Sequence, residues 1–348
     1  MQNKVAIVVT SISQPNTVLK QIATEAMNRN YEFIVVGDTK SPTNFSIDGC
    51  TFLNIDSQLQ LGLAFAEHCP TSHYSRKNIG YLLALSIGAN VIIETDDDNF
   101  PRQDFFNLPS KNCYVPTVDD GQWVNVYRFF SDQLIWPRGF PLNLVKNIPQ
   151  SIDDLPKKTV NCPIQQGLAD ENPDVDAIYR LTLPLPQSFK PSVNVAVGKG
   201  SCCPFNSQNT TWLLETFPLL YLPSYCSFRM TDIWRSFVAQ RIAWENDWYV
   251  LFHEATVRQE RNDHNLMQDF ADEVPGYLHN QLIVDTLNSL ALRRGCTNLF
   301  DNMRKCYKSL VELQVIGSKE LALLEFWLTD VEQSGWVDRL NLINSNIV

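Results

Sequence analysis

One stretch of the sequence decides the fold: Val91-Ile92-Ile93-Glu94-Thr95-Asp96-Asp97-Asp98. Its apolar, β-branched first half is typical of a buried strand, and its acidic second half follows directly. Ligands of open α/β sheets bind beyond the carboxyl ends of the strands, so the acidic half stands where a ligand crevice is expected. Side chains of an extended chain alternate between faces, which predicts that Asp96 and Asp98 project to one side and Asp97 to the other.

Asp96 and Asp98 form an Asp-x-Asp pair that suits a hard divalent cation. Mg²⁺ is commonly held by one or two carboxylates together with substrate phosphates, and Mn²⁺ accepts the same oxygen ligands. The pair therefore predicts a Mg²⁺ or Mn²⁺ ion that bridges to a diphosphate, with Asp97 beside it in the donor site. An acidic turn whose Asp residues cap a helix or meet solvent explains the same residues and stays open.

Composition indicates a globular protein that does not bind nucleic acid. The 348 residues are 44% hydrophobic, and the formal net charge is −10 without clusters of Lys and Arg. A nucleic-acid surface needs such clusters to release counterions. No apolar segment approaches the ~20 residues of a transmembrane helix, and the first residues lack the features of a signal peptide. The nine cysteines are odd in number and scattered, so we expect reduced thiols and a cytoplasmic protein without a transmembrane segment.

Short β-branched runs alternate with helix-forming segments over the first hundred residues. This alternation predicts an α/β fold with a mostly parallel, nucleotide-binding sheet flanked by helices. The expected strands cover residues 5–10, 33–36, 52–55 and 91–95, and the expected helices cover residues 18–29 and 72–87.

The remainder of the chain divides into two parts. Prolines interrupt residues 101–191, which predicts long ordered loops that line an acceptor cleft. A strand is expected at 193–197 and a helix over 231–246, and beyond residue 279 Leu and Ile recur at helical spacing. We therefore expect a sheet domain of residues 1–275 and a helical accessory region of residues 276–348.

Candidates for the nucleotide-sugar site follow the expected strands. Thr10 and Asp38 end the first two strands, where a hydroxyl and a carboxylate can bond a base and a ribose, and Lys40 adds charge at that edge. Arg76 and Lys77 stand near the start of an expected helix, where cations and backbone N–H groups suit a phosphate. Isolated turn residues and a solvated basic face explain these residues equally well and stay open.

The polar stretch 256–265 is a further candidate for phosphate binding. It contains Arg258 and His264, in a loop that could close over the donor. His253 precedes this stretch, and we expect it to be a buried, hydrogen-bonded histidine rather than a metal ligand.

Later acidic segments supply candidates for the sugar and the acceptor. Asp232 stands at an expected helix start, where its carboxylate can accept the proton of an attacking hydroxyl, and Trp234 is expected to form a sugar-stacking wall. Helix capping explains Asp232 and Asp174 as well and stays open. The full acceptor-side set is Asp174, Asp176, Asn206, Arg229 and Trp234.

Several separated motifs occur in an order that is more specific than any Asp-x-Asp pair. With them the chain resembles the STELLO-type glycosyltransferases, plant Golgi proteins associated with cellulose synthesis. The resemblance spans most of residues 4–262, and none is placed after Pro275. The motifs are Gly37-Asp38-Thr39-Lys40-Ser41-Pro42, Leu61-Gly62, Tyr74-Ser75-Arg76-Lys77-Asn78-Ile79-Gly80-Tyr81, Asp96-Asp97-Asp98, Gln166-Gly167-Leu168, Pro173-Asp174-Val175-Asp176-Ala177, Pro204-Phe205-Asn206-Ser207-Gln208-Asn209-Thr210 and Ser227-Phe228-Arg229-Met230-Thr231-Asp232-Ile233-Trp234-Arg235.

This resemblance implies a GT-A type fold, in which an Asp-x-Asp motif holds a divalent cation against the donor diphosphate. Asp96 and Asp98 match that motif. A more distant similarity to reversibly glycosylated polypeptides, which act as UDP-arabinose mutases, also centres on an Asp-Asp-Asp cluster. We expect no counterpart of the transmembrane anchor and long amino-terminal region of the plant members, so their role beside a membrane synthase is not carried over.

The leading interpretation is a metal-dependent glycosyltransferase that moves a sugar from a nucleotide-diphosphate sugar to an acceptor hydroxyl in glycan or polysaccharide synthesis. The expected acceptor is a glycan or a lipid-linked molecule. Asp232 would activate its hydroxyl for an inverting displacement, with retention left open. The rivals are a nucleotide-sugar mutase, a non-catalytic nucleotide-sugar-binding scaffold of a polysaccharide synthase, and a metal-dependent phosphohydrolase.

Overall fold

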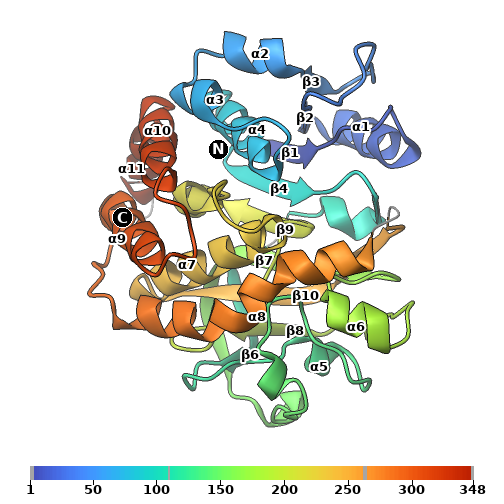
Figure 1. Cartoon of the computed structure of the whole chain (residues 1–348), viewed down its shortest axis with the longest axis vertical. Coiled ribbons are helices and arrows are strands. Elements are labelled where there is room, and N and C mark those ends of the chain that lie inside the picture. Colours follow the sequence, from blue (N-terminus) through green and yellow to red (C-terminus); the bar gives the residue numbers. More distant parts are fainter. Residues whose placement is uncertain (1–3, 109, 262–264, 346–348) are drawn as a thin grey trace.

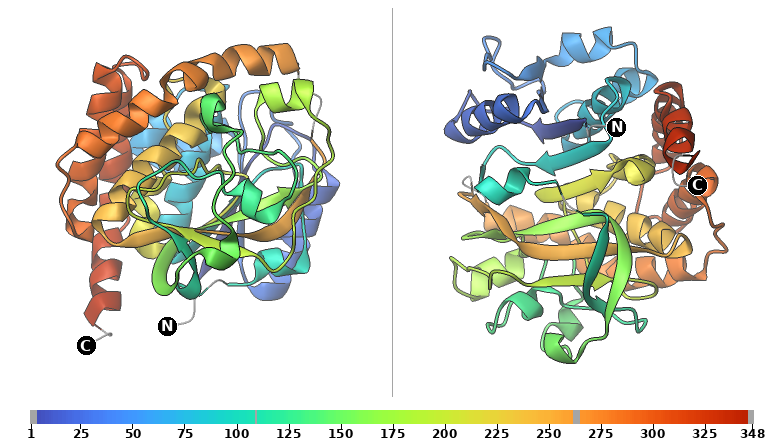
Figure 2. Two further views of the ribbon diagram at one scale, coloured as in Figure 1. Left: turned by 90° about the horizontal axis from the view of Figure 1, so that it is seen from below. Right: turned by 180° about the vertical axis from the view of Figure 1, so that it is seen from behind.

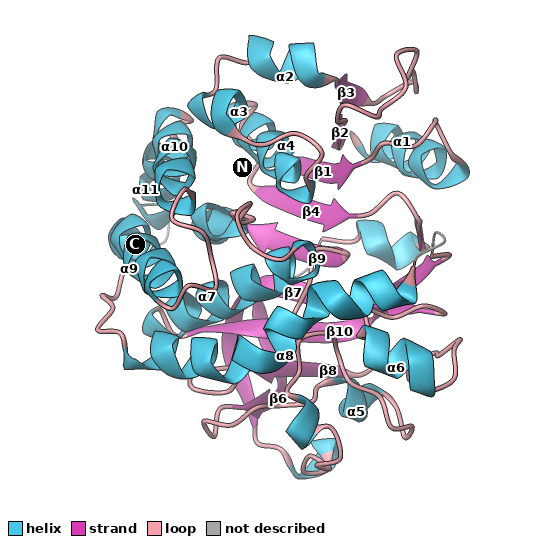
Figure 3. Ribbon diagram, in the orientation of Figure 1, coloured by secondary structure: helices cyan, strands magenta, loops and turns pink. Residues whose placement is uncertain are grey.

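A large mixed sheet forms the centre of the molecule in a computed structural model that describes residues 4–108, 110–261 and 265–345. Within these residues ten strands are ordered β3-β2-β1-β4-β9-β7-β6-β8-β10-β5, with a further pairing of β7 and β10 (Figures 1 and 3). Helices flank this sheet, which confirms the predicted α/β fold. The strands are β1 (Val5–Thr10), β2 (Glu32–Val36), β3 (Thr51–Leu53), β4 (Val91–Thr95), β5 (Asn99–Pro101), β6 (Asn112–Val118), β7 (Lys157–Asp170), β8 (Asn194–Val197), β9 (Asn209–Leu213) and β10 (Trp248–Gln259).

The first four strands form a parallel block that sets the position of the candidate site. β1 pairs in parallel with both β2 and β4, so that Val8 lies beside Ile34 on one side and Glu94 on the other. Their apolar runs are buried on both faces, as is usual for parallel strands between helices. The parallel direction brings the carboxyl ends of β1, β2 and β4 to one edge of the sheet.

Two hydrophobic layers cover the two faces of this block. α1 packs on the face of Val5 and Ile7, and α4 packs on the face of Ala6 and Val8. At Gly80 of α4, an added Cβ would lie 2.6 Å from Val8 Cγ1, so glycine permits a close approach of helix to sheet. The helices are α1 (Thr17–Arg29), α2 (Ile55–Gln60), α3 (Ala64–His68), α4 (Lys77–Ser86), α5 (Tyr127–Phe130), α6 (Ala177–Thr182), α7 (Thr231–Glu245), α8 (Leu266–Ser289), α9 (Leu299–Glu312), α10 (Glu320–Gln333) and α11 (Trp336–Ser345).

The chain after the last strand is helical, as predicted. Helices α9, α10 and α11 lie together on one side of the molecule (Figure 2). Trp327 of α10 is buried in the same hydrophobic cluster as Ala6 of β1. The Asp330 carboxylate accepts the backbone N–H groups of Ala64 (3.1 Å) and Phe65 (2.8 Å), which joins α10 to α3. α8 runs across the expected boundary after residue 275, and the division into two domains stays a prediction.

The expectation of long loops over residues 101–191 is wrong in part. β6 and the fourteen-residue β7 lie in this range, and β7 pairs with β6, β9 and β10. Pro163 and Gly167 interrupt the sequence pattern of β7, and tertiary pairing overrides these weak local signals. Among the described helices, none has the length and hydrophobicity needed to cross a bilayer.

Candidate active site

A pocket of about 420 Å³ opens at the carboxyl ends of β1, β2 and β4. The segment before β9 and the start of α7 complete its wall. The structure thus brings together residues that lie far apart in the sequence. The predicted site residues that line the pocket are Thr10, Asp38, Lys40, Asp96, Asp97, Asp98, Asp174, Asn206, Arg229 and Asp232.

The acidic segment forms a turn between β4 and β5. β4 ends at Thr95, and all three following carboxylates, Asp96, Asp97 and Asp98, line the pocket. The expectation that Asp97 faces away from its neighbours is therefore wrong, because the extended conformation ends before the first aspartate. Asp97 instead accepts a hydrogen bond from Ser11 Oγ at the end of β1.

Asp96 is held by groups from another part of the chain. Its Oδ1 accepts hydrogen bonds from Tyr74 Oη at 2.9 Å and from Lys77 Nζ at 3.1 Å. Burial raises the pKa of Asp96, and the Lys77 charge offsets part of that rise. Gln259 Nε2, at the end of β10, donates to both oxygens of Asp98 at 3.2 Å.

The acidic turn fits a cation that is held jointly with a substrate. Among the described residues, no group of three or more His, Cys, Asp and Glu side chains is arranged to hold a metal ion. Asp96 and Asp98 offer two carboxylates, which is the protein contribution that Mg²⁺ usually has when phosphates supply other ligands. Within the described part of the chain, Asp96 Oδ2 makes no hydrogen bond, so one oxygen remains for a ligand.

The two cations predicted for the donor diphosphate lie outside the pocket lining. Lys77 is fully buried, and its Nζ donates to Tyr74 Oη, Thr95 O, Asp96 Oδ1 and Ser207 O. Arg76 is also buried. Its Nε donates to Gln58 Oε1 at 2.7 Å and its Nη1 to Cys69 O at 2.9 Å. Both side chains are buried and neither lines the pocket, so the expected direct contact of Arg76 and Lys77 with phosphate is wrong.

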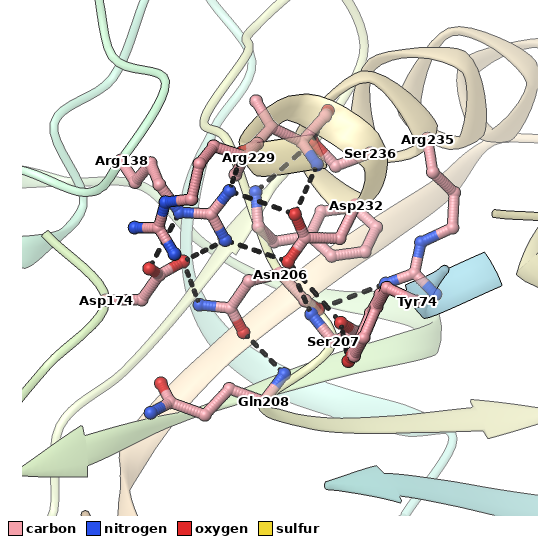
Figure 4. Close-up of polar contacts among 12 residues, drawn as sticks. Tyr74, Arg138, Asp174, Asn206, Ser207, Gln208, Arg229, Asp232, Arg235 and Ser236 are labelled. Carbon is pink, nitrogen blue, oxygen red and sulfur yellow. Dashed lines mark hydrogen bonds and ion pairs between the residues drawn. The ribbon is translucent and has the colours of Figure 1, made fainter. Parts of the chain in front are cut away.

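Arg138 forms the centre of a buried cluster that the sequence did not predict (Figure 4). It binds Asp174 through Nε and Nη2 at 2.8 and 2.9 Å, and Asp232 through Nη1 and Nη2 at 3.0 and 2.9 Å. Asn206 Nδ2 donates to Asp174 Oδ2 at 2.9 Å. Burial would lower the pKa of Arg138, but the two carboxylates outweigh burial and raise it.

These contacts bear on the predicted base, Asp232. Burial favours its neutral form, but the charge and hydrogen bonds of Arg138 outweigh burial and lower the pKa of Asp232 to about 2. A carboxylate with so low a pKa is a weak proton acceptor at neutral pH. The general-base role stays a prediction, and the geometry favours a role in holding Arg138 and the pocket wall.

Tyr74 and Ser207 connect the Arg138 cluster to the acidic turn. Ser207 Oγ lies 2.6 Å from Tyr74 Oη and 3.4 Å from Asp232 Oδ2. Since Tyr74 also donates to Asp96, a chain of hydrogen bonds runs from the predicted metal site to the Arg138 cluster.

Two acceptor-side predictions fall outside the pocket lining. Asp176 caps α6, where it accepts Tyr179 N at 2.8 Å, and burial raises the pKa of Asp176 to about 6. Trp234 is 1% exposed and donates to Asn280 Oδ1 at 2.8 Å. The expectation that Trp234 stacks on a sugar is wrong, because α7 turns this ring into the core. Phe228, which is 53% exposed, supplies an aromatic ring to the pocket wall.

The end of the pocket that was predicted to hold a nucleoside is lined by residues at the carboxyl ends of β1 and β2. Thr10 Oγ1 is buried and has no hydrogen-bond partner among the described residues. The Asp38 carboxylate accepts the N–H groups of Ser72 (2.8 Å) and His73 (3.0 Å), which fixes the loop before α4. Lys40 is exposed at the same edge.

The stretch 256–265, which begins within β10, contributes different residues to the pocket from those expected. Arg261 and Gln259 line the pocket, whereas Arg258 pairs with Glu260 and lies 4.7 Å from the Phe100 ring centroid. His264 lies outside the described residues. His253 is half-buried and its Nδ1 lies 3.1 Å from Glu254 O, in line with a hydrogen-bonded histidine.

Comparison with known proteins agrees with the motifs quoted above. A family model described as "STELLO glycosyltransferases" matches residues 229–347. "Probable glycosyltransferase STELLO1" of Arabidopsis thaliana is 28% identical over 349 aligned residues, which cover 95% of this chain and 44% of that protein. "Probable glycosyltransferase STELLO2" of the same plant is 26% identical over 329 residues, which cover 88% of this chain and 42% of that protein.

The chain is similar to the STELLO glycosyltransferases. It spans less than half the length of these two STELLO relatives. The STELLO family match reaches residue 347, so the expectation that the resemblance stops before the helical tail is wrong. Helices α7, α8, α9 and α10 all lie within the matched range, together with Asp232.

Proposed function

We propose that this protein is a metal-dependent glycosyltransferase that uses a nucleotide-diphosphate sugar. One observation carries the proposal: a single pocket at the ends of three parallel strands contains Asp96 and Asp98 for a divalent cation and Thr10 and Asp38 for a nucleoside. Ligands of open α/β sheets bind in such a place. Both STELLO relatives are named as probable glycosyltransferases, which supports the reaction class.

The residues of the pocket have separable roles in this reaction. The chemistry supplied by a bound Mg²⁺ or Mn²⁺ ion is neutralisation of the negative charge on the departing diphosphate. Asp96 and Asp98 would hold that ion, and Lys77 keeps Asp96 in position through its 3.1 Å contact. Phe228 offers its exposed ring to the sugar or the acceptor. Asn206 and Arg229 line the wall where an acceptor glycan or lipid-linked molecule would contact the protein.

A nucleotide-sugar mutase is the second candidate, and the Asp232 environment favours it. The ion pair with Arg138 lowers the pKa of Asp232 to about 2, against the tendency of burial to raise it. A mutase rearranges the sugar on its own nucleotide, so it has less need of a strong base for an external hydroxyl. A cytoplasmic site of action and a part in polysaccharide synthesis stay predictions.

Donor binding can be tested by calorimetric titration of nucleoside diphosphates and nucleotide sugars, each with Mn²⁺ and with EDTA. We expect one nucleotide to bind with Mn²⁺ and to lose most of its affinity with EDTA or in Asp98→Asn. Asp153→Asn changes an exposed aspartate outside the pocket lining and serves as the matched control. Nucleotide affinity that neither EDTA nor Asp98→Asn changes would exclude the proposed metal site.

Product analysis then separates the reaction classes, with sugar derivatives of the nucleotide that binds supplied as substrates. A sugar joined to an acceptor supports the transferase, and a rearranged nucleotide sugar supports the mutase. Phosphate release without a sugar-containing product supports a phosphohydrolase, and binding without turnover supports a scaffold.

A further inference from the structure

Two arginines from separate segments line the same side of the pocket. Arg229 lies in the short 3-10 helix η6 (Phe228–Met230), directly before α7, and Arg261 follows the end of β10 by two residues. Their side chains are 13% and 11% exposed, so each guanidinium is largely withdrawn from solvent and still reaches the cavity. Guanidinium groups in such a position suit a planar anion such as a carboxylate or a phosphate.

These arginines share their carboxylate partners. Arg261 Nη2 lies 2.7 Å from Asp269 Oδ2, and Arg229 Nε lies 3.9 Å from the other oxygen of Asp269. Arg229 Nη2 also binds Glu273 Oε1 at 2.9 Å. Both acids belong to α8, which therefore supports the two arginines from behind.

A third guanidinium, that of Arg180, increases the positive charge behind this wall. It donates to Pro173 O at 2.8 Å and to Asn172 Oδ1 at 3.4 Å, and both acceptors are uncharged. Arg138 has its own two carboxylates and does not draw on those of α8. Three arginines, Arg180, Arg229 and Arg261, thus lie close to two acids of α8, Asp269 and Glu273.

The crowding of these cations affects their pKa values and their hydrogen bonds. Burial and the neighbouring Arg261 lower the pKa of Arg180 to about 10, and burial and Arg229 lower the pKa of Arg261. Arg261 Nε is buried and has no hydrogen-bond partner among the described residues. A buried cationic donor without a partner is unfavourable, and a bound anion would remove that cost.

We propose that Arg229 and Arg261 form an anion site that binds a phosphate or carboxylate group of the substrate. The inference rests on the proposed function, because it assigns the anion to a molecule bound in the same pocket. Gln259 donates to Asp98 at 3.2 Å, so the segment that carries Arg261 lies beside the acidic turn. The anion is either the donor diphosphate or an acid group on the donor sugar or the acceptor. Arg261 would then have the role that Arg76 and Lys77 were expected to have.

The anion site can be tested without any nucleotide. Binding of pyrophosphate and of glucuronate is measured in EDTA by calorimetry and thermal shift, with wild type, Arg261→Gln and Arg258→Gln. Arg258 is the matched control, because it lies three residues earlier in β10 and is outside the pocket lining. We expect wild type and Arg258→Gln to bind at least one of the two anions, and Arg261→Gln to lose about tenfold or more in affinity for it. Equal binding by Arg261→Gln and wild type, or no binding by wild type, would overturn the proposal.

Arg261→Lys covers the case in which Arg261→Gln fails to fold. Lysine keeps the charge opposite Asp269 but presents one ammonium group in place of the guanidinium fork. We expect wild-type thermal stability with affinity between those of wild type and Arg261→Gln. Wild-type affinity in a folded Arg261→Lys protein would show that a charge suffices and would reject the planar guanidinium site.

Nucleotide ligands identify the source of the anion. In one outcome, Arg261→Gln loses affinity equally for a nucleoside diphosphate, for its hexose derivative and for its uronate derivative, and loses none for the nucleoside. That result would assign the anion to the donor diphosphate. A loss of affinity for the nucleotide uronate alone would assign the anion to an acidic donor sugar. A loss of affinity for free pyrophosphate or glucuronate, without a loss for any nucleotide ligand, would assign it to the acceptor. Asp98→Asn should retain binding in EDTA, so failure of the metal site and failure of the anion site give different results.

Discussion

The guanidinium of Arg138 binds both carboxylate oxygens of Asp232, at 3.0 and 2.9 Å. Its Nε and Nη2 also bind Asp174, so one buried cation lies between two buried carboxylates. The geometry is bidentate on both sides, which is the strongest form of charge-assisted hydrogen bonding available to arginine. Asp232 therefore takes part in a structural unit before any substrate arrives.

Arg138→Gln should destabilise the fold strongly. Removal of one partner from a buried ion pair leaves uncompensated charges, which costs about 3–5 kcal/mol in the free energy of unfolding. Urea unfolding at pH 7 measures the change. Arg304→Gln, which breaks a half-exposed pair with Glu325 on the surface, serves as control and should cost at most about 1 kcal/mol. A similar small cost for Arg138→Gln would show that the two acids carry no charge in the folded protein.

The stability that Asp232 contributes should disappear in acid. Its folded pKa of about 2 lies below the ~3.9 of a free Asp side chain. The contribution is therefore fully present above about pH 4 and is lost as the pH falls toward 2, because the unfolded chain binds the proton first. Urea unfolding of wild type and Asp232→Asn from pH 7 to pH 3 should show a gap, on the order of 2 kcal/mol at pH 7, that narrows below pH 4. A constant gap would contradict the lowered pKa.

Substitution of Lys77 by Met should lower stability, whereas substitution of Lys40 by Met should lower nucleotide affinity. Lys77→Met leaves the buried acceptors around Lys77 unpaired and should cost about 3 kcal/mol or more in unfolding free energy. Lys40→Met alters an exposed side chain at the pocket edge, so it should leave stability near wild type and weaken nucleotide binding in low salt. Thermal unfolding and titration with the bound nucleotide test both variants. Near-normal stability of Lys77→Met would show that Lys77 is replaceable by packing.

Phe228 and Trp234 provide a second pair of opposite effects. Phe228→Ala should weaken sugar or acceptor binding while the protein keeps most of its stability, because this ring is 53% exposed. Trp234→Ala should cost about 3–5 kcal/mol, as expected for a large aromatic side chain removed from a core. Saturation kinetics and urea unfolding compare the two. Unchanged KM values in Phe228→Ala would remove this ring from the binding surface.

The sheet and the helical tail should unfold together. Trp327 of α10 shares a buried cluster with β1, and Asp330 of the same helix binds two N–H groups of α3. Calorimetry of the full chain should therefore give one transition, and a chain that ends at residue 275 should fail to fold cooperatively. Two separate transitions, or a folded 1–275 fragment, would support the predicted division into independent domains.

The parts of the fold with strong local patterns were predictable from sequence. The strand at Val91–Thr95 and the helix that begins at Thr231 lie where the pattern indicates. Strand β7 was not predictable, because Pro163 and Gly167 interrupt its local pattern and the strand depends on pairing with β6, β9 and β10. Distant pairing partners leave no local signal in a single sequence.

The candidate site divides in the same way. Acids at strand ends, such as Asp38 and Asp96, were placed at the pocket by the parallel sheet. The cations Arg76 and Lys77 were misplaced, since they stand near the start of the expected helix but are buried away from the pocket. Arg138 gave no signal, because it lies between prolines and aromatic residues and meets its carboxylates through tertiary folding. Of the two arginines in the predicted stretch 256–265, Arg261 lines the pocket and Arg258 does not, and the phosphate-binding role of this stretch stays a prediction.

The buried ammonium group of Lys77 stabilises the acidic turn in the protein without a bound ligand. Because it already neutralises one carboxylate of the acidic turn, three adjacent acids can coexist without a cation from solution. The binding surface is thus preorganised, and little reorganisation energy is needed when a ligand enters. Under the proposed metal dependence, a shortage of divalent ions would lower ligand occupancy of the pocket while the protein keeps its shape.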